Sequence, residues 1–303
     1  MQLKQIFSKY EISYKVYQSI RVILTSISPT LATKVIFRIS KGRPLDLKNP
    51  RTLDEKISWL KLNTYYKNPL VSKCADKYAV REYIKTCGCP EILNELYGVY
   101  NSVEGIPWAD LPDRFVLKWN MGCGCNIICA DKNSLDIENA RQLLSYWGKK
   151  KYYLSHAEMQ YKYIPPRIIC EKYLEVLEGE LPDYKFYCFN GEAKYVMVCL
   201  GRGQGHPQFY YYDREWNLLK LSEDAINAPA DFNLPKPDVI EEMFEYASKL
   251  SKPFPFVRAD FYLVDGKIIF GELTFTPSGG IDSGRLPETD IALGRLVKLP
   301  IEC

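Results

Sequence analysis

The segment from Val257 to Gly280, VRADFYLVDGKIIFGELTFTPSGG, constrains the fold more than any other part of the chain. Its apolar and polar residues alternate, which predicts two short strands that each present one apolar face and one charged face. The Asp265-Gly266 pair predicts the turn between these strands. The polar residues that share even positions are Arg258, Asp260, Glu272 and Thr274.

The register of this hairpin decides what its charged face can do. A strict two-residue loop would place Asp260 and Glu272 on opposite faces. A three-residue loop or a single β-bulge would place them side by side, and we expect that arrangement. Two carboxylates beside Arg258 would suit a phosphate-bound magnesium ion, because hard cations take oxygen ligands and phosphates supply the rest. The alternative is an ordinary amphipathic hairpin with solvated charges.

The composition indicates a globular protein without a histidine-based site. The 303 residues can form two modest domains or one larger unit, and 47% of them are hydrophobic and 25% charged. Two histidines make a histidine metal site or a histidine base a poor expectation. The ten cysteines include the pairs Cys87/Cys89 and Cys123/Cys125, whose spacing suits neither a zinc knuckle nor a disulfide framework. Reduced thiols in a cytosolic protein are the simpler expectation.

The first 43 residues are basic, with eight Lys or Arg and a single acid, Glu11. The start of the chain shows no signal-peptide cleavage pattern. A basic amphipathic segment can lie on an anionic membrane surface; a helical pair packed on the main body is the alternative. No nucleic-acid-binding motif accompanies the charge, so we expect no nucleic-acid partner. No apolar run is long enough to cross a membrane, because the stretches are interrupted by Arg21, Lys34 and Arg38.

The remaining pattern mixes helices and strands. Residues 3–40 are predicted to be helical with a break at Ser28-Pro29, and Thr52 with Glu55 forms a capping-box signature for the next helix. Further helices are predicted at 76–85, near 137–153 and at 237–250, and strands in FVLKW, NIICA, RIICEKYLE, DYKFYCFNG and KYVMVCLG. This order predicts an α+β or α/β protein with mainly antiparallel sheets.

A glycine loop lies between two of the predicted strands, in the segment KWNMGCGCN that begins at Lys118. Gly122 and Gly124 would let the backbone approach phosphate oxygens closely, and Lys118 would add a positive charge. The alternative is a common hairpin turn, since the segment lacks the longer spacing of a P-loop.

Two other polar groups are candidates for a ligand site. Lys77 and Arg81 are four apart and would share one face of the predicted 76–85 helix; the alternative is a solvated face with Asp76 as a cap. Asp183 and Lys185 would share a strand face, where they could bind a ribose hydroxyl and a phosphate. A cross-strand ion pair is the alternative for the second pair.

Five segments in this order resemble the ATP-grasp superfamily, and more narrowly its teichuronopeptide-type (TupA-like) members from bacterial surface-polysaccharide clusters. The resemblance runs from about Pro44 to the end, and implies an ATP-grasp fold in which two α+β subdomains hold ATP between them. We expect a basic helical region at 1–70, a subdomain with the glycine loop at 71–175 and a subdomain with the metal site at 176–303. The segments are NPRTLDEKISWLKL, DKYAVREYI, LPDRFVLKWNMGCGCN, DYKFYCFNG and FPFVRADFYLVDGKIIFGELTFTPSGG.

The resemblance also implies roles for the residues that match the family's motifs. Lys77 and Lys118 would be the two nucleotide lysines, under the phosphate-covering turn of Gly122 and Gly124. Arg258 would steady the transferring phosphoryl group, with Lys118 as the other catalytic cation. The adenine, ribose and phosphate contacts would involve Glu171, Lys172, Tyr173, Leu174, Asp183 and Lys185. The magnesium ligands would be Asp260, Glu272 and Thr274, the last standing where asparagine is usual in the wider superfamily.

The implied activity is an ATP-dependent ligase that uses Mg²⁺ and joins a carboxylate to an amine through an acyl phosphate, releasing ADP. The expected carboxylate is a uronic acid of a capsule or other cell-surface polysaccharide precursor, and the expected amine is an amino acid or amino alcohol. Arg202 and Arg285 are candidates to meet this anionic substrate, or else ordinary surface arginines. We expect a cytoplasmic protein with a peripheral contact at the inner face of the plasma membrane. The alternatives are a glycosyltransferase, an ATP-dependent sugar kinase and a non-catalytic scaffold.

Overall fold

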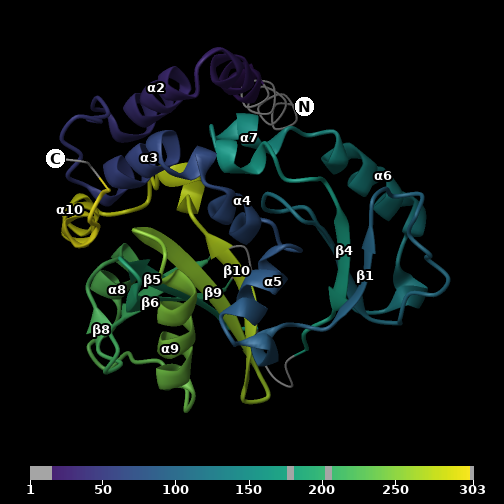
Figure 1. The fold of residues 1–303 in the computed structure, drawn as a ribbon. Helices are drawn as coiled ribbons and strands as arrows, with labels where there is room; N and C mark the ends of the chain where they lie inside the picture. Colours follow the sequence, from purple (N-terminus) through teal and green to yellow (C-terminus); the bar gives the residue numbers. More distant parts are fainter. Residues whose placement is uncertain (1–15, 176–180, 202–206, 301–303) are drawn as a thin grey trace, which may run out of the picture.

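Two antiparallel sheets organise the chain in a computed structural model that describes residues 16–175, 181–201 and 207–300 (Figure 1). The smaller sheet has the order β1-β4-β2-β3, with β1 (Leu96–Tyr100), β2 (Phe115–Trp119), β3 (Asn126–Cys129) and β4 (Ile168–Lys172). The larger sheet has the order β10-β9-β5-β6-β7-β8. Its strands are β5 (Asp183–Phe189), β6 (Glu192–Leu200), β7 (Gln208–Tyr212), β8 (Leu218–Leu219), β9 (Phe256–Val264) and β10 (Lys267–Thr274).

Helices surround both sheets and connect them. After a helical stretch at residues 16–27 come α2 (Pro29–Lys41), α3 (Leu53–Asn63), α4 (Pro69–Ala75), α5 (Val80–Thr86) and α6 (Ile137–Gly148). The later helices are α7 (Tyr152–Ser155), α8 (Glu223–Asn227), α9 (Ile240–Ser251) and α10 (Pro287–Leu296). Short 3-10 turns are η1 (Tyr65–Lys67), η2 (Pro90–Ile92), η3 (Lys132–Ser134), η4 (Met159–Tyr161) and η5 (Pro277–Gly280).

Each sheet has its own hydrophobic core. Phe115, Leu117 and Leu144 belong to the core between the smaller sheet and α6. The core of the larger sheet contains Phe186, Phe244 and Phe261, together with apolar residues from α3, α4, α5 and α10. The chain therefore passes from helices that pack on the larger sheet, through the smaller sheet, and back. The three-part division at 70 and 175 remains a prediction.

Several local predictions agree with the structure. Thr52 caps α3, and its side chain and that of Glu55 make both hydrogen bonds of the capping box. Ser28 caps α2 at the expected break, while the expected helix before residue 16 lies outside the described residues. The sheets are antiparallel throughout the described strands. Strands β1, β7 and β8 were not predicted.

The helix predicted to begin at Asp76 begins instead at Val80. Asp76 has extended backbone angles and ends α4, and its carboxylate accepts hydrogen bonds from the Tyr78 backbone N–H at 2.8 Å and from Asn120 Nδ2 at 2.8 Å. Lys77 therefore precedes the helix, so the prediction that Lys77 and Arg81 share a helix face is wrong. The long helix predicted near 137–153 is also divided, because α6 ends at Gly148 and α7 starts at Tyr152.

The hairpin of β9 and β10 has the register expected from its polar residues. Lys267 pairs with Val264 next to the turn, but beyond Phe270 the pairing shifts by one residue, so that Glu272 pairs with Asp260. The extra residue of this β-bulge is Gly271, where a Cβ atom would lie 3.0 Å from the carbonyl oxygen of Asp260. The bulge places the two carboxylates side by side, as predicted.

The capping box predicts a measurable contribution to stability. We expect Thr52→Ala to lower the free energy of unfolding by about 1 kcal/mol, because the backbone N–H of Glu55 loses its partner. Urea denaturation measures this change. Thr30→Ala, at an exposed threonine in the first turn of α2, is the control, and an equal loss in both variants would contradict the assignment.

Candidate nucleotide-binding site

A row of alternating charges crosses one face of the larger sheet. Lys185 Nζ lies 2.5 Å from Asp183 Oδ2 on its own strand and 3.0 Å from Asp260 Oδ2 on the next. Arg258 Nη2 lies 2.6 Å from Asp260 Oδ2 and 3.8 Å from Glu272 Oε1. The row is a consequence of register, because Lys185 and Glu272 both pair directly with Asp260 from opposite sides.

Mutual neutralisation keeps this row charged although it is buried. Burial alone would raise the pKa of Asp260, but Arg258 and Lys185 outweigh that effect and hold it below its usual range. Burial would likewise lower the pKa of Arg258, but Asp260 reverses the shift and raises it. Glu272 differs from the others because 37% of its side chain is exposed. It is therefore the carboxylate of this row that an incoming cation can reach.

Lys77 connects this row to the glycine loop of the smaller sheet. Its Nζ donates a hydrogen bond to the carbonyl oxygen of Gly122 at 2.5 Å and lies 3.7 Å from Glu272 Oε2. Its backbone N–H donates to the carbonyl oxygen of Asn120, the residue that follows β2. One lysine side chain therefore contacts the loop after β2 of the smaller sheet and Glu272 on β10 of the larger sheet, so it lies where these two parts of the chain meet.

The glycine loop has backbone angles that favour glycine at two positions. Gly122 and Gly124 have φ angles of +75° and +72°, in the left-handed region that favours glycine. A Cβ atom at Gly122 would lie 2.3 Å from the ring of Tyr152 in α7, so a larger residue would displace one of them. The Tyr152 hydroxyl also donates to the carbonyl oxygen of Cys123 at 2.5 Å. Tyr152 thus holds the loop, and no local pattern in the sequence indicated this role.

Lys118 pairs with Glu171 on the smaller sheet, at 2.7 Å between Nζ and Oε2. Arg81 approaches the other oxygen of the same carboxylate at 3.4 Å and donates to the carbonyl oxygen of Asn94 at 2.8 Å. The structure therefore separates Arg81 from Lys77, which the sequence placed on one face, and brings it to Lys118. The two expected nucleotide lysines therefore have different carboxylate partners: Lys77 approaches Glu272 on the larger sheet, and Lys118 pairs with Glu171 on the smaller sheet.

The segment expected to meet adenine ends β4. The backbone N–H of Lys172 donates to the carbonyl oxygen of Glu95 at 3.0 Å, and its carbonyl oxygen accepts from Asn94 Nδ2 at 2.9 Å. Tyr173 lies under the guanidinium of Arg114 at 4.7 Å. Adenine contacts by Glu171, Lys172, Tyr173 and Leu174 remain a prediction, as does the ribose contact of Asp183.

Three further predicted residues have partners within the protein. Lys185 forms the cross-strand ion pair that the sequence left as an alternative, with Asp260, and it also pairs with Asp183 along its own strand. The Thr274 hydroxyl donates to Glu272 Oε1 at 3.0 Å and accepts from Arg258 Nη2 at 3.4 Å. A magnesium contact by Thr274 remains a prediction.

The carboxylates fit a magnesium ion that arrives with phosphates rather than a metal held by protein alone. Among the residues that the structure describes, no group of three or more His, Cys, Asp or Glu side chains could hold a metal ion. Asp260 and Glu272 are adjacent across β9 and β10, and Mg²⁺ is commonly bound by one or two carboxylates with phosphates and water completing its shell. Glu272 is the carboxylate that the ion can reach, and a magnesium contact by Asp260, which pairs with Arg258 and Lys185, remains a prediction.

A second polar cluster lies beyond the end of β10 and was not predicted. The Thr276 hydroxyl donates to Glu158 Oε1 at 2.5 Å and accepts from Gln160 Nε2 at 3.0 Å. Lys61 Nζ donates to the carbonyl oxygens of His156 and Gly279, each at 2.9 Å. These residues come from three separate stretches of sequence, so only the fold brings them together.

Arg285 does not face a substrate cleft. It is buried and forms ion pairs with Asp54 and Asp290, which tie the start of α3 to α10. It is therefore neither the expected substrate contact nor an ordinary surface arginine. Arg202 lies outside the described residues.

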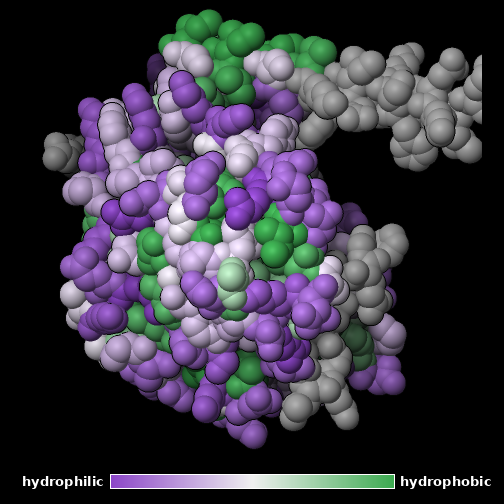
Figure 2. All heavy atoms as spheres, turned by 90° about the vertical axis from the view of Figure 1, so that its right-hand side faces the viewer, coloured by the Kyte–Doolittle hydropathy of each residue, from purple (hydrophilic) through white to green (hydrophobic). Residues whose placement is uncertain are grey.

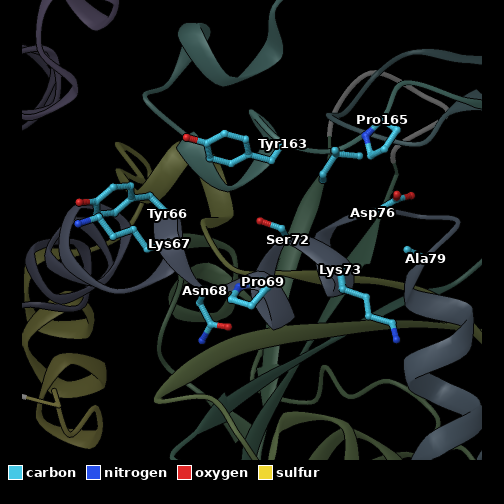
Figure 3. A pocket seen from close by; sticks show the side chains of 11 residues that line it. Tyr66, Lys67, Asn68, Pro69, Ser72, Lys73, Asp76, Ala79, Tyr163 and Pro165 are labelled. Atoms are coloured by element: carbon cyan, nitrogen blue, oxygen red, sulfur yellow. The ribbon is translucent and has the colours of Figure 1, made fainter.

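A large pocket lies beside the charged row and not within it. It has a volume of about 590 Å³ and is bounded by η1, α4, the start of α5 and the residues before β4. Figure 3 shows the rings of Tyr66 and Tyr163 towards one side of this pocket and Asp76 and Ala79 at the other. Asp76 is the residue next to Lys77, so this pocket borders the residues expected to bind the nucleotide without containing them.

The sequence profile of the TupA-like ATP-grasp family matches residues 55–298. The chain belongs to this family. As a TupA-like ATP-grasp protein it has the ATP-grasp fold. None of the curated proteins compared with the chain matches it.

Solved ATP-grasp structures are similar to the TupA-like chain at low identity. D-Alanine–D-alanine ligase from Bacillus anthracis, complexed with ATP, is 13% identical over 87% of this chain and 74% of its own, with a TM-score of 0.39. The ATP-grasp ligase PsnB, complexed with a precursor variant, Mg and ADP, is 13% identical over 79% and 65%, with a TM-score of 0.39. N5-carboxyaminoimidazole synthase from Aspergillus clavatus is 12% identical over 68% and 45%, with a TM-score of 0.40.

The exposure of Glu272 predicts a functional loss without unfolding. We expect Glu272→Gln to keep the thermal midpoint nearly unchanged and to weaken Mg·ATP binding at least tenfold, because one of two adjacent carboxylates is removed. Calorimetric titration with Mg·ATP measures the binding. Glu245→Gln, at an exposed glutamate of α9, is the control, and unchanged binding in Glu272→Gln would remove it from the metal site.

Proposed function

We propose that the protein uses ATP to join the carboxylate of a uronic acid, on a capsule or other cell-surface polysaccharide precursor, to an amine. The observation that carries this proposal is the pairing of Glu272 with Asp260 beside Arg258, with Lys77 reaching from that row to the glycine loop. This arrangement offers cations and a reachable carboxylate at one place, which is what phosphoryl transfer to a carboxylate requires.

The proposed reaction has two steps. A carboxylate oxygen of the uronic acid attacks the γ-phosphorus of ATP, the bond to the bridging oxygen breaks, and ADP leaves. The amine then attacks the acyl carbon, the carbon–oxygen bond to phosphate breaks, phosphate leaves with the electron pair, and the amine loses a proton to solvent. The acyl phosphate is needed because a free carboxylate is a poor electrophile.

The protein contributes positioning and charge. Lys77 and the amides around Gly122 and Gly124 would hold the phosphates, while Arg258 would offset the charge that develops on the transferred phosphoryl group. Bound Mg²⁺ would supply further charge neutralisation between the phosphates. Because Arg258 is already fixed by two hydrogen bonds to Asp260, it needs little reorganisation during the reaction.

The large pocket beside the charged row supports a sugar as the carboxylate substrate. Tyr66 and Tyr163 offer ring faces of the kind on which a pyranose can pack, and Lys67 and Lys73 offer positive charge for a uronate. The resemblance to teichuronopeptide-type members of surface-polysaccharide clusters supports the same substrate class.

An ADP-release assay distinguishes this reaction from its alternatives. With Mg·ATP and a uronic-acid glycan, we expect ADP release to rise at least tenfold when a suitable amine is added, because the acyl phosphate is then consumed. Release with a neutral sugar acceptor and no amine would favour a sugar kinase. Consumption of a nucleotide sugar without ATP would favour a glycosyltransferase, although the sequence contains no Asp-x-Asp motif.

A cytoplasmic location with peripheral contact at the inner membrane face is part of the proposal. Of the twelve large apolar side chains that are exposed in the described part of the chain, six lie between residues 16 and 39. Figure 2 shows this apolar surface at the top of the molecule. Within residues 16–41, no helix is long and apolar enough to cross a membrane, and the same holds for the other described helices.

The spacing of these residues forms one continuous stripe. Val16, Ile20, Ile23 and Ile27 recur every three or four residues, so they share one face of the first helix, and Ile27 is 73% exposed. Lys34 and Arg38 are exposed on α2 near Leu31 and Ile39, which continue the apolar surface. Apolar side chains flanked by cations suit the surface of an anionic bilayer.

Liposome co-sedimentation tests this contact. We expect the protein to sediment with vesicles that contain phosphatidylglycerol and much less with pure phosphatidylcholine, because binding combines apolar burial with charge attraction. The double variant Ile23→Asp/Ile27→Asp should lose most of the binding. Ile226→Asp, at an exposed isoleucine of α8, is the control; equal binding by all three proteins would contradict the proposal.

A further inference from the structure

A small pocket of about 90 Å³ is lined by residues of the first helix, α2, α3 and η5. Its lining includes Arg21 from the first helix, Lys61 from α3, His156, and Ser278 and Gly279 from η5. Ser278 and Gly279 have positive φ angles, and a Cβ atom at Gly279 would lie 2.4 Å from His156 Nδ1. The glycine therefore allows η5 to approach His156 closely.

Two buried cations in this pocket lack carboxylate partners. Arg21 is 6% exposed; its Nη2 donates to His156 Nδ1 at 2.6 Å, and its Nε has no hydrogen-bond partner. Lys61 is 1% exposed and donates only to backbone carbonyl oxygens. Within residues 16–175, 181–201 and 207–300, neither forms an ion pair. Burial, then the charges of Arg21 and Lys61, lowers the pKa of His156 to about 4, so its ring adds no charge at neutral pH.

The nearest acid compensates these cations only in part. Burial raises the pKa of Glu158, and its favourable interactions with Thr276 and the two cations do not cancel that rise. Buried charge of one sign is costly unless it is paired and hydrogen-bonded. A carboxylate is the anion that an arginine fork with a neighbouring ammonium group recognises well, and its size suits a pocket of this volume.

Acceptors suited to an ammonium group lie near this pocket but outside its lining, because Glu158 interacts electrostatically with both Lys61 and Arg21. Glu158 and Gln160 both bind the Thr276 hydroxyl, and Gln160 is fully buried with no hydrogen-bond partner for its Oε1. Glu158 also interacts electrostatically with Glu272 and with Cys123 of the glycine loop. Acceptors therefore lie next to the nucleotide-site residues, and unpaired cations lie beyond them.

We propose that Arg21 and Lys61 bind the carboxylate of the amine substrate while Glu158 and Gln160 receive its amino group, so that this substrate is an amino acid and not an amino alcohol. This inference rests on the proposed ligase function, whose amine substrate it specifies. It also gives the first helix a part in substrate recognition, because Arg21 and Tyr17 of that helix line the pocket.

Matched amine pairs test the inference. ADP release with Mg·ATP and a uronic-acid glycan is measured with amino acids and with the corresponding amino alcohols, for example L-alanine against L-alaninol across a panel of side chains. We expect the best amino acid to exceed its alcohol at least tenfold in kcat/KM. Amino alcohols that equal their amino acids would overturn the inference while leaving the ligase function intact.

Variants of Arg21 separate substrate binding from folding. We expect Arg21→Gln to raise the KM for the amino acid about tenfold or more, with kcat and the KM for ATP little changed, because a buried charge-assisted contact is lost. Arg21→Lys should recover part of the loss. Arg295→Gln, at an exposed arginine of α10, is the control for charge and should behave as the parent protein. Equal KM values for the amino acid in all four proteins would overturn the inference.

A binding measurement keeps the pocket testable if the ligase function fails. If no amine stimulates ADP release, calorimetric titration with acetate still reports on the pocket. Acetate binding that Arg21→Gln weakens and Arg295→Gln does not would support a carboxylate site. Acetate binding that is absent, or equal in the parent and Arg21→Gln, would overturn it.

Discussion

The β-bulge at Gly271 sets the face on which the candidate site is built. Strands β9 and β10 are joined by a two-residue turn, and without an extra residue Glu272 would pair with Ala259 and point away from Asp260. The bulge moves Glu272 opposite Asp260 and aligns it with the charges of β5. The extra residue Gly271 therefore determines whether Glu272 joins the other charges on one face of the sheet or lies on the opposite face.

The charges that result are stable in a buried position only because they alternate. Asp260 lies between Lys185 and Arg258, and these cations hold it ionised against the effect of burial. Removing one member would leave its partner buried and unpaired, which typically costs several kcal/mol. The same requirement leaves Glu272, at the exposed end of the row, as the residue free to meet a cation, and Lys77 links it to the glycine loop. Structural and functional charges are therefore parts of one continuous arrangement.

The first helix presents an apolar outer surface and a buried arginine, although its sequence shows only a basic segment. Val16, Ile20, Ile23 and Ile27 face outwards on one side, while Arg21 is directed inwards to the pocket at His156. Residues three or four apart share a helix face, so an apolar outer stripe and a buried arginine can coexist in twelve residues. If both proposals hold, a membrane contact would hold the helix that also recognises the amine substrate.

The sequence by itself determined the features that depend on neighbouring residues: the capping box of Thr52 and Glu55, the glycine loop between two strands, and the charged hairpin with Asp260 beside Glu272. Only the tertiary structure decided the long-range partners. Asp76, at the end of α4, accepts a hydrogen bond from Asn120 after β2, Lys118 pairs with Glu171, and Tyr152 holds the glycine loop. Local patterns fix backbone conformation through sterics and hydrogen bonds between adjacent residues, whereas the partner of a buried charge is set by which strands and helices pack together.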